Sequence, residues 1–141
     1  MLRATATAHD GDAVDSITLD HEQRHRRRAA LVSDGGLEFL LDLPQAALLH
    51  DGTRLLLEDG RRIEVRAAPE PVLDIRSPDL ARIAWHLGNR HTPAQILPDR
   101  LRIRDDHVLA EMLHGLCAEV TALSAPFEPE SGAYAHGHHG H

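Results

Sequence analysis

The sequence predicts an α+β protein with an all-β N-terminal domain, a mixed C-terminal domain and a histidine-rich tail. Short apolar runs separated by glycine-containing turn signals fill residues 16–67. After prolines 69 and 71, strand-like segments alternate with two helix-like ones. Four of the last six residues are histidines. These changes predict domains at residues 1–70 and 71–127 and a flexible tail at residues 128–141.

The N-terminal half reads as strands joined by tight turns. Gly-Gly after Asp34, and Gly after Asp51 and Asp59, supply the positive-φ positions that such turns need. Ile63 and Val65 alternate with polar residues, as in a half-buried strand. Residues 1–15 are small, polar and rich in Asp, so we expect a frayed start.

The C-terminal half contains two predicted helices with apolar stripes. In the first, we expect Ser77 as N-cap, Pro78 at the first helical position and Gly88 at the end. Asp105 and Asp106 are expected to cap the second, whose stripe runs to Val120. Strands are expected at residues 72–75, 94–97, 101–104 and 121–127. The resulting order, β-α-β-β-α-β, is the ferredoxin-like arrangement.

Composition excludes several classes of protein. The formal charge of −7 over 141 residues argues against a general nucleic-acid binder. The single cysteine, Cys117, excludes an intramolecular disulfide and is expected on the buried side of the second helix. No segment resembles a signal peptide or a membrane span, so we expect a cytoplasmic protein.

The tail histidines form the strongest chemical signal. Neutral imidazole suits nickel, zinc and copper, and a glycine-spaced arm can offer several imidazoles to one ion. A purification tag is the alternative, but tags are usually uninterrupted runs, which favours a native metal-binding tail. The residues are His136, His138, His139 and His141.

Two further places that contain histidines give weaker evidence for metal binding. His91 follows the predicted helix end and, on spacing alone, reads as a surface or cap residue. His107, Glu111 and His114 could share one helix face and resemble a hydrolytic zinc site, but a solvated face is the favoured interpretation. No Gly-rich phosphate loop or nucleophile motif is present, so we expect no enzymatic activity.

Four strings of residues carry a family resemblance. His-Leu-Gly-Asn-Arg-His at residues 86–91, Asp-His-Val-Leu at 106–109 and Pro-Phe-Glu-Pro-Glu-Ser-Gly-Ala-Tyr at 126–134 resemble the urease accessory protein E family. Asp-Gly-Arg-Arg-Ile-Glu-Val at 59–65 resembles the N-terminal domain of that family. The similarity covers nearly the whole chain, in the same order and at the same distances.

The resemblance implies a nickel metallochaperone that delivers Ni(II) for assembly of the urease metallocentre. It implies a homodimer in which His91 of both protomers binds the metal, with His107 as a secondary ligand. The tail histidines are implied to be metal ligands as a group, without an individual role for each. Asp105 stands where some members carry another histidine. The implied partners are the urease accessory GTPase and the complex of urease apoprotein with accessory proteins.

Without the resemblance, the residues leave other functions open. The same histidines would serve a nickel or zinc storage protein, and His107, Glu111 and His114 could belong to a small metallohydrolase. The sequence does not distinguish nickel from zinc or copper. Copper would bind a site of bare imidazoles more tightly than nickel does.

Overall fold

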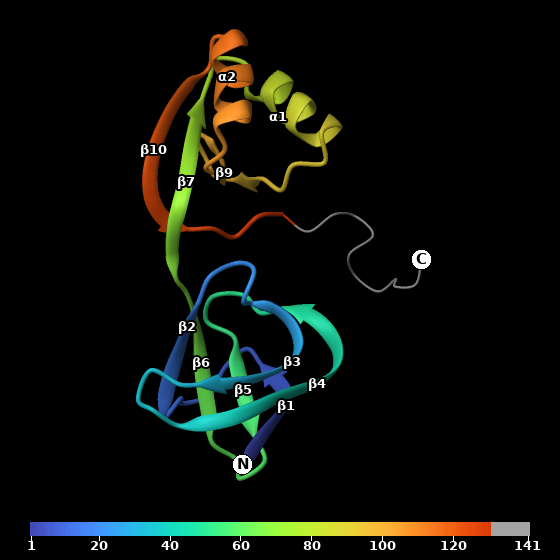
Figure 1. The fold of residues 1–141 in the computed structure, drawn as a ribbon, viewed down its shortest axis with the longest axis vertical. Helices are drawn as coiled ribbons and strands as arrows, with labels where there is room; N and C mark the ends of the chain where they lie inside the picture. Colours follow the sequence, from blue (N-terminus) through green and yellow to red (C-terminus); the bar gives the residue numbers. More distant parts are fainter. Residues whose placement is uncertain (131–141) are drawn as a thin grey trace. The chain divides into compact units, whose positions relative to one another are not determined.

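The computed structural model describes residues 1–130, which contain ten strands and two helices (Figure 1). The chain divides into two compact units, with the division between Ala68 and Pro69. No helix among the described residues has the length and apolar content to cross a membrane.

The first unit is a six-stranded sheet with no helix among its strands, as the sequence predicts. Its strands are β1 Leu2–Ala8, β2 Asp15–Leu19, β3 His25–Val32, β4 Glu38–Leu48, β5 Arg54–Leu57 and β6 Arg62–Ala67. They lie in the order β2-β6-β5-β1-β4-β3. The predicted turn at Asp59 and Gly60 joins the antiparallel strands β5 and β6, and Gly60 has φ 90°.

The expectation of a frayed N-terminus is wrong. Strand β1 pairs in parallel with β4 and antiparallel with β5, so both of its edges are hydrogen-bonded. Its side chains alternate in size and polarity, and Ala4 is fully buried in the core of this unit. Sheet pairing on both sides therefore orders a segment whose small residues gave only a weak signal.

The second unit has the predicted element order, β-α-β-β-α-β. Its elements are β7 Pro69–Arg76, α1 Leu80–Asn89, β8 Gln95–Ile96, β9 Leu101–Arg104, α2 His107–Gly115 and β10 Glu119–Pro126. The sheet order is β10-β7-β9-β8. Both helices lie on the same side of this sheet (Figure 1), and Ile83, Leu87 and Leu113 pack into its apolar core.

Helix α1 begins later than predicted. Asp79 is its N-cap and accepts a hydrogen bond from the amide of Arg82 at 3.2 Å. Ser77 instead accepts from the amide of Asp79 at 3.0 Å, and so supports the turn before the helix. Pro78 therefore precedes the helix and does not occupy its first position.

Helix α2 is shorter than predicted, and three residues differ from their predicted places. It ends at Gly115, so Val120 belongs to β10 and not to the helical stripe. Cys117 lies in the turn after the helix with φ 59° and is exposed, so the expected core position is wrong. Val108, another member of the predicted stripe, is 50% exposed.

A buried ion-pair network crosses the sheet of the second unit. Asp74 on β7 accepts from Arg102 Nε at 2.7 Å and from Arg100 Nε at 2.8 Å. The hydrogen bond from Arg102 and the charge of both guanidinium groups hold the pKa of Asp74 below its usual value, although burial opposes this. Arg102 also donates to the carbonyl of Pro126 at 3.0 Å, which ties the end of β10 to the sheet.

Candidate metal centre

His91 stands directly after helix α1, at a position that the helix end defines. Its amide donates to the carbonyl of Gly88 at 2.9 Å, and the amide of Thr92 donates to the carbonyl of Leu87 at 3.0 Å. This pair of bonds is the Schellman motif that closes many helices. The backbone at His91 is therefore fixed even though the residue lies in a turn.

The Schellman motif places His91 in an unusual conformation. Its φ is 56°, in the left-handed region where glycine or asparagine normally stands. A side chain with a Cβ is disfavoured there by about 1–2 kcal/mol. The same closure puts Cys117 after α2 at φ 59°, so the conformation of His91 follows from helix capping and does not by itself indicate function.

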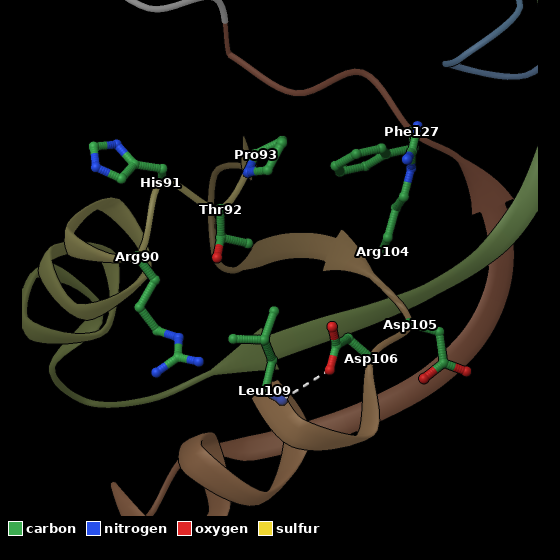
Figure 2. A pocket seen from close by; sticks show the side chains of 9 residues that line it. All are labelled: Arg90, His91, Thr92, Pro93, Arg104, Asp105, Asp106, Leu109 and Phe127. Atoms are coloured by element: carbon green, nitrogen blue, oxygen red, sulfur yellow. Dashed lines mark hydrogen bonds between the residues drawn. The ribbon is translucent and has the colours of Figure 1, made fainter.

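The imidazole of His91 is exposed at the edge of a hollow of about 370 Å³. Figure 2 shows the ring turned outward, away from the centre of the hollow. The lining residues are Arg90, His91, Thr92, Pro93, Arg104, Asp105, Asp106, Leu109 and Phe127. An outward ring can meet a ligand that approaches from solvent or from another protein.

Phe127 and Arg104 form the opposite wall of the hollow. No sequence pattern predicted a site at either residue. Phe127 is fully buried, and the Arg104 guanidinium lies 5.9 Å from the centre of its ring. Phe127 is one of only two phenylalanines in the chain and stands next to Pro126. That scarcity was the one sequence signal for an anchoring residue.

His107 is the first residue of α2. The carboxylate of Asp106 caps this helix by accepting from the amides of Val108 at 2.9 Å and Leu109 at 3.1 Å. The His107 side chain is exposed and does not line the hollow, whereas Asp105 and Asp106 do. The hollow thus brings His91 to the same surface as the start of α2 but does not include His107.

The helix face of His107, Glu111 and His114 does not form a ready metal site. All three side chains are exposed. Within residues 1–130, no group of three or more His, Cys, Asp or Glu side chains is arranged to hold an ion. The geometry gives no support to a metallohydrolase built on these residues.

The segment assigned to the start of the tail is attached to the fold as far as Glu130. The amide of Glu128 donates to Gln95 Oε1 at 3.0 Å, and that of Glu130 donates to the carbonyl of Ala94 at 2.8 Å. Glu130 is therefore fixed at Ala94, which stands three residues along the chain from His91. The predicted ligands His136, His138, His139 and His141 lie outside the described residues.

Comparison with known proteins covers both units. Residues 2–68 match the family model described as UreE urease accessory protein, N-terminal domain, and residues 70–141 match the corresponding C-terminal domain. A relative named urease accessory protein UreE from Chelativorans sp. (strain BNC1) is 58% identical over 146 residues, covering 100% of this chain and 92% of its own.

Relatives with the same name differ in length. The one from Rhodobacter capsulatus is 58% identical over 125 residues, with 89% of this chain and 80% of its own covered. The one from Bradyrhizobium sp. (strain ORS 278) is 57% identical over 132 residues, with 92% of this chain but 63% of its own covered. The chain therefore spans less than two thirds of some relatives and nearly all of others.

Proposed function

The chain belongs to the UreE urease accessory protein family, and on this premise we propose that it binds Ni(II) and delivers it for assembly of the urease metallocentre. The observation that supports this proposal is the placement of His91. Its backbone is fixed by the end of α1, while its imidazole is exposed to an incoming ligand. That combination suits a carrier, which must hold an ion and then release it.

We propose that the tight site forms between two copies of the chain. One chain offers a single imidazole at this position, and the described residues contain no complete ligand set. In a homodimer with two-fold symmetry the same surface patch faces its own copy, so one His91 per chain becomes two. The imidazole of His91 is turned to the outer side of the hollow (Figure 2), where a second chain could meet it.

The tail can supply further ligands because of where it starts. Ala94 is three residues from His91, and three residues span at most about 11 Å. Glu130 is hydrogen-bonded to Ala94, and the six residues to His136 span up to about 20 Å when extended. His136 and the residues after it can therefore reach an ion at His91 without any movement of the fold.

Delivery also requires partners and a choice of metal. Imidazole ligands alone favour copper over nickel, so nickel specificity must come from metal availability and from docking. The proposed docking partners are the urease accessory GTPase and the complex of urease apoprotein with accessory proteins. A storage protein would use the same ligands but would not activate urease.

A urease activation assay tests delivery. Nickel-loaded protein is added to the apoprotein–accessory complex and the GTPase, and urea hydrolysis is followed. His91→Ala should give no more activation than the same concentration of free nickel. The matched control is His114→Ala, an exposed histidine on α2, which should activate as the wild type does. Full activation by His91→Ala would contradict the proposal.

A further inference from the structure

A second pair of histidines lies in the first unit, one in the turn after β2 and the other at the start of β3. The sequence there is His21-Glu22-Gln23-Arg24-His25, so the two histidines are four residues apart. Their ring centroids are 6.5 Å apart with an interplanar angle of 68°. This pair is remote in the sequence from His91 and belongs to the other compact unit.

The turn that joins these two histidines is a single helical turn with its own cap. The amide of Arg24 donates to the carbonyl of Asp20 at 3.0 Å, which is the i to i−4 bond of an α-helix. Asp20 Oδ1 accepts from the amide of Gln23 at 2.8 Å, and Gln23 Oε1 accepts from the amide of Asp20 at 2.9 Å. This reciprocal arrangement is a capping box, and it fixes the N-terminal end of the turn.

The buried side chain of Arg24 attaches the turn to the interior of the first unit. Its side chain is fully buried and donates from Nε to the carbonyl of Leu19 at 3.2 Å and from Nη1 to that of Leu49 at 3.3 Å. Arg24 points into the unit, and His25, which follows it, is the first residue of β3; the contact between the two rings places His21 and His25 side by side. His25 is exposed and His21 is partly exposed, so solvent and ions reach the pair.

We propose that His21 and His25 form a second metal site, one that holds a divalent transition ion of the nickel, copper and zinc group. Two histidines four residues apart are a known pair of metal ligands on a helix; here the second lies at the start of β3, and the contact between the rings supports the pairing. Metal–nitrogen bonds of about 2.1 Å on each side require both rings to turn a nitrogen atom toward the same ion. The turn is already fixed by the capping box and by Arg24, so binding does not have to order it.

The site is a binding site and not a hydrolytic centre. His-Glu-x-x-His is the zinc protease motif, but in that motif a long helix and a third protein ligand complete the site. Here the helical part is one turn, and no third ligand joins the pair among residues 1–130. Water completes the coordination, so the ion is held more weakly than in a three-ligand site and exchanges readily.

The test uses a full-length background in which His91 and the four tail histidines are replaced by Asn, so that competing imidazoles are removed. Copper(II) is added below one equivalent, and amide intensities are followed in ¹H–¹⁵N spectra. We expect amides of residues 20–25 to broaden first. In His25→Asn on this background the broadening of residues 20–24 should disappear. His9→Asn, which removes another exposed histidine of the same unit, should leave it unchanged.

Nickel calorimetry on the unsubstituted chain gives an independent measurement that does not depend on the background. His25→Asn should bind one nickel ion fewer per chain than wild type, or bind it at least tenfold more weakly, while His9→Asn matches wild type. Equal broadening around His9, His50 and residues 20–25 would overturn the proposal, as would unchanged binding in His25→Asn. Because the background lacks His91, failure here is distinct from failure of the delivery proposal.

Discussion

The amide of Thr92 donates to the carbonyl of Leu87 at 3.0 Å, and this bond closes helix α1 around His91. Leu87 is fully packed in the core of the second unit, so the bond relates the candidate metal ligand directly to that core. The left-handed backbone of His91 follows from this closure. The position of His91 is therefore determined by the fold.

The strained backbone predicts a conflict between stability and function at residue 91. His91→Gly relieves the left-handed conformation but gives the unfolded chain more freedom, so the net gain should be about 0.5–1 kcal/mol. Metal-free protein should therefore melt a few degrees higher in calorimetry while nickel binding is lost. The control His114→Gly, within α2, should lower stability by about 1 kcal/mol. A lower melting temperature for His91→Gly would show that the imidazole itself stabilises the fold.

Phe127 should contribute more to stability than any other residue that follows β10 in the described chain. It is fully buried beside Arg104 at the wall of the hollow. Phe127→Ala should lower the free energy of unfolding by about 3–5 kcal/mol. The same change should weaken nickel binding, because residues 128–130 lose their anchor near His91. Chemical denaturation measures the first effect, and a variant as stable as wild type would contradict it.

Asp74 should give the second unit an acid-sensitive contribution to stability. The pKa of Asp74 is lowered in the folded state, so its contribution is complete above the unfolded pKa and is lost as pH falls through the folded value. Asp74→Asn leaves two arginines without their buried carboxylate and should cost about 3 kcal/mol at pH 7.

The difference between Asp74→Asn and wild type should shrink below about pH 4, where Asp74 becomes protonated in the unfolded wild-type chain while it stays ionised in the folded one. Denaturant unfolding at several pH values measures it. Asp99→Asn is the matched control, because Asp99 also contacts Arg100 but its side chain is 62% exposed. Its effect should be small at every pH. A gap for Asp74→Asn that stays constant down to pH 3 would contradict the assignment.

Removal of the tail histidines should separate metal capacity from folding. Deletion of residues 135–141 removes none of the apolar core residues found within 1–130. The shortened protein should melt at the wild-type temperature without metal and bind fewer nickel ions per chain. A large drop in the metal-free melting temperature would show that these residues support the fold.

Local patterns predicted the helices and turns of this protein better than its strand pairings. Helix α2 is capped by Asp106, and Gly60 occupies the turn between β5 and β6, because both features depend on neighbours in sequence. The parallel pairings of β1 with β4 and of β2 with β6 join distant segments, and no local pattern specifies them. The central place of β1 was missed for this reason.

The features of the candidate site also divide into those that local sequence predicts and those that only the folded chain shows. His91 could be singled out only through the resemblance, since its spacing alone indicated a surface residue, and the left-handed backbone becomes visible only in the folded chain. Phe127 and Arg104 join the hollow through tertiary packing. The pair of His21 and His25 did carry a local signal, the four-residue spacing, but its meaning depends on the buried Arg24 between them.

The central claim is that two chains share one tight nickel site through His91. Nickel titration by calorimetry, with light scattering on the same samples, tests it directly. The account predicts that the tightest event has one nickel ion per two chains in wild type. His91→Ala should lose that event and remain a dimer, whereas His107→Ala should keep it. A tightest event of one nickel ion per chain, or one that survives in His91→Ala, would contradict the shared site.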